Sequence, residues 1–157
     1  MSDKLVIYFS ASAGSVTKRV AEKLANAIDA DIFEIEPETE YTAADIKWTN
    51  PLARCNKEKL GRKDVPFKKR IENLSDYETV YIGFPIWYGI APNIVSTFVR
   101  AHNFVGRKII VFATSGGSGL GKTSAKLQRD LGEAKIVGEK LLNAGMSEEE
   151  LKEWAKF

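Results

Sequence analysis

Near its beginning the chain carries an apolar run, Leu5-Val6-Ile7-Tyr8-Phe9, which leads directly into the hydroxyl-rich turn Ser10-Ala11-Ser12-Ala13-Gly14-Ser15-Val16-Thr17. A continuous apolar run of this length is typical of a strand covered on both faces of a parallel sheet. The pattern then becomes helical, because apolar residues recur every four positions, at Val16, Val20, Leu24 and Ile28. The turn therefore joins a buried strand to the N-terminus of an amphipathic helix, and Val16 to Ile28 are expected to form one buried stripe.

We expect this turn to hold a phosphate group. A helix N-terminus offers unpaired backbone N–H groups and the positive end of the helix dipole. Four hydroxyls between Ser10 and Thr17 add neutral donors, and the turn contains no Lys or Arg. Such a set suits a permanently bound monophosphate better than a phosphate that is transferred. The alternative is an ordinary strand-to-helix turn with a serine N-cap.

Length and composition indicate one domain spanning residues 1–157, since 157 residues with 44% apolar and 28% charged side chains fit a single globular unit. The formal net charge of +2 argues against a nucleic-acid binder. The first residues lead straight into a short strand, which is too short for a signal peptide or a membrane span, so we expect a cytoplasmic protein without a membrane partner. The single cysteine, Cys55, allows no internal disulfide and no structural zinc site by itself, and no metal is expected.

Four more strands follow along the chain, at Asp31–Glu36, Glu78–Phe84, Arg107–Thr114 and Lys135–Leu141. They alternate with helical patterns, the last of which begins with a capping box of Ser147 and Glu150. Five strands alternating with helices predict an α/β protein with a doubly wound parallel sheet, three layers αβα and right-handed crossovers. The long connection between Glu38 and Arg70 changes from acidic to basic. It is read either as solvated short helices at 42–46 and 52–60 or as a flap with a basic docking surface.

Two further loops carry unusual residues. Pro85-Ile86-Trp87-Tyr88-Gly89-Ile90-Ala91-Pro92 places two large rings between prolines, and Gly83 before it is expected to allow a close approach. Thr114-Ser115-Gly116-Gly117-Ser118-Gly119-Leu120-Gly121 offers a backbone that can lie against a ligand. In a sheet of order 2-1-3-4-5 the loops after strands one, three and four meet at one crevice. A ligand with one phosphate, a flexible spacer and a broad flat ring suits all three, and flavin mononucleotide (FMN) is that ligand. In the alternative reading the two rings cap the core.

A motif in the second half of the chain indicates a different function. Gly116 to Thr123 matches the phosphate loop of nucleoside triphosphatases, with Lys122 before Thr123. The chain leaves only one strand and one helix after this motif, and no strand ends in the Asp that holds magnesium, so we disfavour that function. A phosphorelay receiver is excluded because the first and third strands do not end in carboxylates.

The chain resembles the flavodoxins, specifically the short bacterial flavodoxin-like proteins, over essentially its whole length. The resemblance rests on Tyr8-Phe9-Ser10-Ala11-Ser12, Gly83-Phe84-Pro85-Ile86-Trp87-Tyr88 and Ala113-Thr114-Ser115-Gly116-Gly117-Ser118-Gly119. It implies a phosphate site at Ser10, Ser12, Ala13, Gly14, Ser15, Val16 and Thr17. It further implies ring contacts at Pro85, Ile86, Trp87, Tyr88 and Gly89, and contacts to the pyrimidine edge and ribityl chain at Thr114, Ser115, Gly116, Gly117, Ser118 and Gly119. The near-neutral charge differs from the strongly acidic flavodoxins.

The resulting expectation is an FMN-binding protein of the flavodoxin-like fold that carries one or two electrons between redox partner proteins, with no catalytic side chain of its own. The first alternative is an FMN-dependent oxidoreductase that takes hydride from NAD(P)H and reduces a small quinone-type substrate. The second is a regulatory protein that uses the fold to bind a partner.

Overall fold

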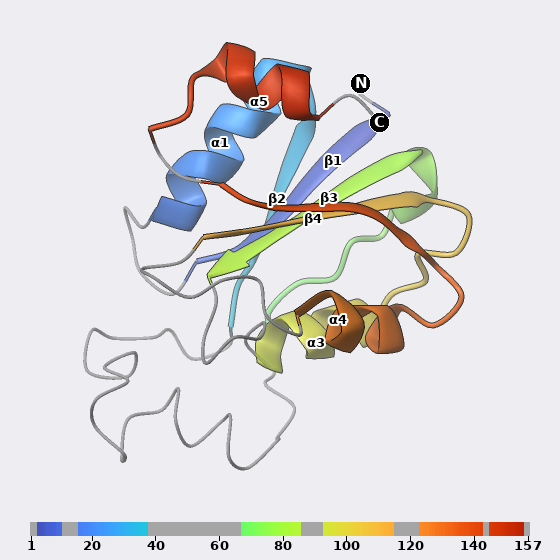
Figure 1. Cartoon of the computed structure of the whole chain (residues 1–157). Coiled ribbons are helices and arrows are strands. Elements are labelled where there is room, and N and C mark those ends of the chain that lie inside the picture. Colours follow the sequence, from blue (N-terminus) through green and yellow to red (C-terminus); the bar gives the residue numbers. More distant parts are fainter. Residues whose placement is uncertain are drawn as a thin grey trace, which may run out of the picture.

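The sheet order observed is the predicted one. The computed structural model describes residues 3–10, 16–37, 67–85, 93–114, 123–142 and 145–155. They contain a five-stranded parallel sheet in the order β2-β1-β3-β4-β5 (Figure 1). Its strands are β1 Lys4–Phe9, β2 Asp31–Ile35, β3 Thr79–Pro85, β4 Lys108–Thr114 and β5 Ile136–Leu141. Each bound lies within one residue of its predicted position, so the doubly wound α/β fold is confirmed.

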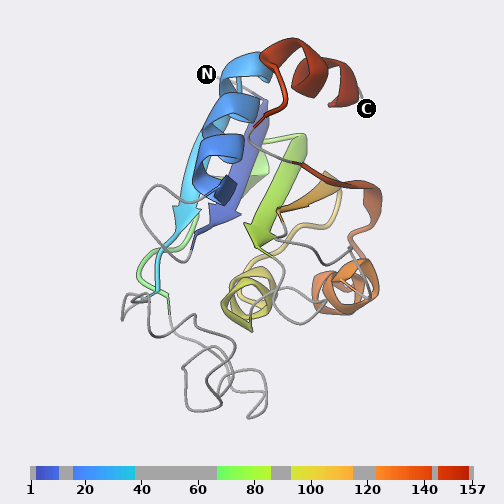
Figure 2. The same ribbon diagram turned by 60° about the vertical axis from the view of Figure 1, so that its left-hand side comes forward.

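Helices cover both faces of this sheet and complete the predicted αβα layers (Figure 2). They are α1 Val16–Ile28, α3 Asn93–Arg100, α4 Thr123–Leu131 and α5 Glu148–Trp154, with a short 3₁₀ helix at Leu74–Asp76. The helices α1 and α5 share one face, whereas α3 and α4 share the other. The predicted capping box is present at α5, where the Ser147 hydroxyl accepts from the Glu150 backbone N–H at 3.1 Å.

The alternation of side chains along β1 explains why its apolar run is unbroken. Leu5, Ile7 and Phe9 pack into the cluster beneath α3 and α4. Val6 and Tyr8 face the opposite way and pack against α1 and α5. Both sets are buried, which is the arrangement expected of a strand with helices on each face.

The buried stripe of α1 differs from the predicted one at its first residue. Val16 is 39% exposed, whereas the next residue, Thr17, is 2% exposed. Val20 and Leu24 are buried as expected, and Ile28 is partly buried. The prediction for Val16 was wrong because spacing alone does not reveal that the inward position of the first turn is occupied by a threonine with a hydrogen-bond partner in the core.

A short antiparallel bridge joins Pro37, just after β2, to Phe67. Next to it, the backbone N–H of Lys68 donates to the carbonyl of Glu36 at 2.8 Å, and their side chains form an ion pair at 3.8 Å. We call these contacts, made by Glu36, Pro37, Phe67 and Lys68, the neck. The helices predicted at 42–46 and 52–60 lie outside the described residues, as does most of the basic segment.

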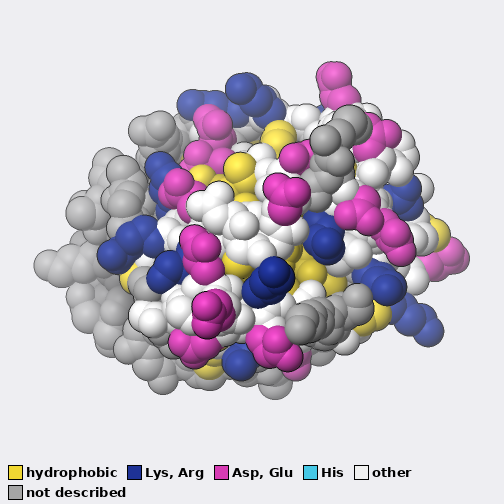
Figure 3. Space-filling model, turned by 90° about the horizontal axis from the view of Figure 1, so that it is seen from above, with side chains coloured by type: hydrophobic (Ala, Val, Ile, Leu, Met, Phe, Trp, Pro, Cys, Tyr) yellow, Lys and Arg dark blue, Asp and Glu magenta, His cyan; other side chains and the backbone are white. Residues whose placement is uncertain are grey.

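The face that bears α1 and α5 carries basic and acidic side chains interspersed with one another (Figure 3). It therefore presents no extended surface of a single charge among the side chains described there. Among the residues that the structure describes, no helix combines the length and apolar character that crossing a bilayer requires.

Candidate functional site

Three strand ends meet at the carboxyl edge of the sheet. Register pairing places Tyr8 of β1 beside Gly83 of β3, and Pro85 at the end of β3 beside Thr114 at the end of β4. Because the strands are parallel, the chain leaves all three at the same edge. The strand order reverses between β1 and β3, which is the place where open α/β sheets bind their ligands.

A hydrogen bond between two threonine hydroxyls spans this edge. The Oγ1 atoms of Thr17 and Thr114 are 2.5 Å apart although the residues are separated by 97 positions in sequence. The two residues are 2% and 5% exposed. Thr17 belongs to the first turn of α1 and Thr114 is the last residue of β4. The contact therefore holds the start of α1 against the end of the fourth strand.

The N-terminus of α1 is electrostatically suited to an anion. Its first turn contains no acidic residue and includes the basic residues Lys18 and Arg19. Ser10, which ends the described part of the first strand, is partly buried. Hydroxyls, backbone amides and a positive helix end can thus gather around one phosphate.

The structure places five of the predicted site residues, namely Ser10, Val16, Thr17, Pro85 and Thr114. All five lie at the carboxyl edge or in the first turn of α1. The remaining predicted site residues lie outside the described residues: Ser12, Ala13, Gly14, Ser15, Ile86, Trp87, Tyr88, Gly89, Ser115, Gly116, Gly117, Ser118 and Gly119.

Gly83 allows a close approach, as expected, and the group that approaches it is a side chain of the core. The ring of Phe112 packs against its Cα and fills the space that a Cβ would need. The close approach at this position is therefore made by a core side chain of β4. The sequence shows an aromatic residue, Phe112, in the neighbouring strand. Only the register of β3 and β4, which pairs Gly83 with Phe112, reveals that the two residues are in contact.

Tyr8 lies near this edge, and its sequence pattern predicted no role for its phenol. Burial raises the pKa of its phenol to about 12, and the nearby carboxylates of Glu34, Glu22 and Glu36 act in the same direction. Glu34 is its register partner on β2. The phenol therefore stays neutral and keeps its proton throughout the physiological range.

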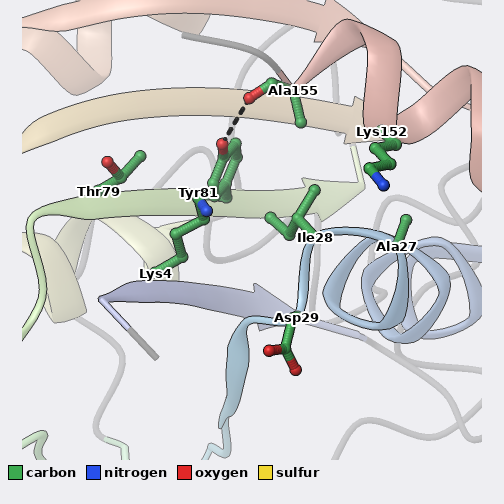
Figure 4. A pocket seen from close by; sticks show the side chains of 8 residues that line it. All are labelled: Lys4, Ala27, Ile28, Asp29, Thr79, Tyr81, Lys152 and Ala155. Atoms are coloured by element: carbon green, nitrogen blue, oxygen red, sulfur yellow. Dashed lines mark hydrogen bonds between the residues drawn. The ribbon is translucent and has the colours of Figure 1, made fainter. Parts of the chain in front are cut away.

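A separate cavity of about 640 Å³ opens at the other end of the sheet (Figure 4). It is lined by Lys4, Ala27, Ile28, Asp29, Thr79, Tyr81, Lys152 and Ala155. Lys4 and Thr79 are the first residues of β1 and β3, so the cavity lies at the amino edge, away from Thr17 and Thr114. The C-terminal ends of α1 and α5 lie here too, and lysines are favourable at helix C-termini. This cavity is thus distinct from the site at the carboxyl edge.

Comparison with known proteins agrees with the geometry. A sequence model of the family described as flavodoxin matches residues 3–157. The chain belongs to the flavodoxin family. No curated protein is significantly similar in sequence to this flavodoxin-family chain.

Solved structures of flavodoxin relatives extend the match. A candidate flavoprotein from Bacteroides eggerthii DSM 20697 is 36% identical with a TM-score of 0.88, covering 96% of this chain and 94% of that chain. A second, from Bacteroides uniformis ATCC 8492, is 37% identical with a TM-score of 0.89, covering 98% and 97%. A flavoprotein from Lactobacillus acidophilus NCFM, solved in complex with FMN, is 20% identical with a TM-score of 0.73 and covers 98% of each chain. At that identity the last likeness concerns the fold.

Proposed function

We propose that this flavodoxin-family protein binds one FMN per chain and carries electrons between redox partners. The observation that carries the proposal is the buried hydroxyl pair of Thr17 and Thr114, which joins the start of α1 to the end of β4 beside the point where the strand order reverses. The FMN-bound relative from Lactobacillus acidophilus, which shares the fold, supports the choice of ligand.

The described residues fit the phosphate of FMN. A phosphate is an anionic acceptor, and the edge offers the hydroxyls of Ser10 and Thr17 together with the N-terminal amides of α1. No carboxylate lies in the first turn of α1 to repel it. Neutral donors bind a phosphate without promoting cleavage of its ester bond. Such a site suits a cofactor that is bound and not transformed at its phosphate.

The ring system would lie between the two loops that leave the sheet at Pro85 and Thr114. These residues are register partners, so the loops start side by side. In the sequence, Trp87 and Tyr88 follow one strand end and the glycine-rich run 115–119 follows the other, so we expect aromatic contacts from the first and backbone contacts from the second. Bound FMN supplies the capacity to take up and release one or two electrons. The chain's part is to hold the ring and to limit its contact with water.

The partner proposed is a redox protein. Lys69 and Arg70 are exposed next to the neck, and the residues before them in sequence are rich in Lys and Arg, so an acidic partner surface is the natural complement. No nucleic acid is involved in this proposal, and the carrier would work in the cytoplasm.

A second candidate is an FMN-dependent NAD(P)H:quinone-type oxidoreductase. It is favoured by the position of the neck, because Pro37 follows β2 and residues 38–66 therefore leave and rejoin the fold on the carboxyl side of the sheet. A connection of that length can contribute a pocket for a nicotinamide or a quinone.

Two measurements test these proposals. Acid release of the cofactor from purified protein, followed by chromatography, is expected to yield one FMN per chain. Recovery of the adenine dinucleotide, or no binding after incubation with FMN, would reject the proposal. Steady-state oxidation of NAD(P)H with and without a quinone then separates the two functions, since a carrier shows no saturable turnover without a reductase.

A further inference from the structure

The buried pair of Thr17 and Thr114 has more hydrogen-bonding capacity than its mutual contact uses. Each hydroxyl owns one proton and two lone pairs. When one donates to the other across 2.5 Å, the proton of the acceptor hydroxyl is left for a third group. Among the described residues, no further hydrogen bond to either hydroxyl accounts for that proton.

The direction of the chain of hydrogen bonds follows from where an anion can sit. Thr17 lies at the positive end of α1 and directly follows the hydroxyl-rich turn. A phosphate there has no proton to give and accepts only. The order that satisfies all three groups has Thr114 donating to Thr17 and Thr17 donating to the anion.

We propose that Thr114 is a positioning residue for phosphate binding and acts through Thr17. Its hydroxyl fixes the rotamer of Thr17, aims the remaining proton at the phosphate and polarises it, as successive hydrogen bonds strengthen one another in a buried setting. Thr114 thereby links the phosphate turn to the glycine-rich run that begins at the next residue. This inference rests on the proposed function.

The test compares FMN with riboflavin, which has the same ring and ribityl chain but no phosphate. Thr114→Val keeps the shape of the side chain and removes the hydroxyl. We expect about a tenfold weaker affinity for FMN, equivalent to about 1.4 kcal/mol, with riboflavin affinity changed less than twofold. Thr17→Val should give at least the same loss, and the double variant no more than Thr17→Val alone, because Thr114 acts only through Thr17.

Two control variants and one spectroscopic measurement distinguish a loss of the Thr114 hydroxyl from a loss of folding stability. Thr114→Ser retains a hydroxyl and is expected to restore most of the FMN affinity. Thr79→Val removes a buried threonine hydroxyl at the amino end of β3 and should leave the affinities for both ligands unchanged. The phosphorus-31 resonance of bound FMN should shift in Thr114→Val even at saturation, which a loss of folding stability alone would not produce.

The results distinguish a failure of the role inferred for Thr114 from a failure of the proposed FMN binding. Equal losses for FMN and riboflavin in Thr114→Val mean that Thr114 contacts the ring or the ribityl chain and overturn the inference while FMN binding stands. Additive effects in the double variant overturn it as well. A wild-type protein that binds neither ligand rejects the proposed function and the inference together.

Discussion

The ring of Phe112 lies against the Cα of Gly83, so that a methyl group at residue 83 would collide with the ring's Cζ. Phe112 is fully buried and belongs to the cluster under α1 and α5. We expect Gly83→Ala to lower the free energy of unfolding by about 1–3 kcal/mol, as overpacking of a core does. Chemical denaturation measures it.

The matched control for that substitution is Phe112→Leu, which removes the atoms that clash. In the Phe112→Leu background, Gly83→Ala should cost markedly less than in the wild type. Equal costs in both backgrounds would show that the glycine is required for another reason, such as the close approach of a ligand.

A second prediction concerns the alkaline side of the pH scale. The pKa of Tyr8 is raised from 10.0 to about 12 by burial and by the carboxylates of Glu34 and Glu22. The unfolded chain therefore loses this proton first, and the stability that Tyr8 contributes is complete below pH 10 and is lost between about pH 10 and 12. Absorbance titration at alkaline pH should show a late tyrosine that is missing in Tyr8→Phe. If the variant instead lacks a tyrosine that ionises near pH 10, the interpretation is wrong.

His102 gives a prediction on the acidic side. Its Nε2 accepts from the backbone N–H of Ile71 at 2.9 Å, and its Nδ1 lies 2.7 Å from the carbonyl of Phe98, which together require a neutral ring protonated at Nδ1. Burial lowers its pKa below 6.5, and the charge of Arg70 adds to this. The unfolded chain binds the proton first, so stability should fall as the pH drops below about 6.5 and level off below the folded pKa.

The chain has one histidine, which makes the measurement direct. Nitrogen-15 spectra should show a single imidazole that titrates below its ordinary value. His102→Phe should remove the pH-dependent slope in this window, although it also removes two hydrogen bonds. A ring that titrates at or above 6.5 contradicts the buried, neutral assignment.

Two tyrosines with similar bonds allow a paired comparison. The hydroxyl of Tyr81 donates to the carbonyl of Ala155 at 2.8 Å and ties β3 to the end of α5. The hydroxyl of Tyr77 donates to Asp31 Oδ2 at 2.7 Å, at the start of β2. Tyr81→Phe should lower stability by about 0.5–1.5 kcal/mol, because a buried hydrogen bond is lost.

Hydrogen exchange distinguishes the two sites. Amide protection in α5 should fall in Tyr81→Phe and remain unchanged in Tyr77→Phe, whereas the latter affects the first residues of β2. Loss of α5 protection in both variants would mean that global stability, and not the individual contact, controls the exchange.

The last prediction bears on the cofactor. Trp87 is expected to stack on the ring of FMN, so Trp87→Ala should weaken binding by about 0.5–1.5 kcal/mol beyond lost burial and increase the emission of bound flavin. Trp154→Phe is the control, since Trp154 packs near Tyr81 on the α1 and α5 side. Retained quenching and an unmoved reduction potential in Trp87→Ala would place Trp87 in the core instead.

The strands were predictable because their signal is local. Leu5–Phe9 and the apolar middle of β4 are buried on both faces, and continuous apolar runs record that directly. The order of the sheet followed from the alternation of strands and helices together with the loops that had to converge. Neither inference needed to know which side chains touch.

The contacts between elements were not predictable in the same way. The pairing of Thr17 with Thr114 depends on the placement of α1 against β4, and the packing of Phe112 on Gly83 depends on register. A four-residue spacing assigned Val16 to the buried stripe because it is apolar, whereas the hydrogen bond of its neighbour decides the orientation of the turn. The spacing of apolar residues shows that a helix has a buried face. Contacts with residues far away in the sequence decide which residues lie on that face.

The neck brings together the two ends of the connection between β2 and the segment before β3. The arrangement of the sheet should therefore depend little on the length of that connection. A backbone hydrogen bond joins Lys68 to Glu36, so the end of β2 and the segment that leads to β3 lie side by side. Joining ends that are already adjacent costs little more for a long connection than for a short one. We therefore expect the fold to tolerate connections of other lengths and sequences between Pro37 and Phe67. Replacing residues 38–66 by other sequences is therefore a way to change the preference for a partner or a substrate while the flavodoxin fold is kept.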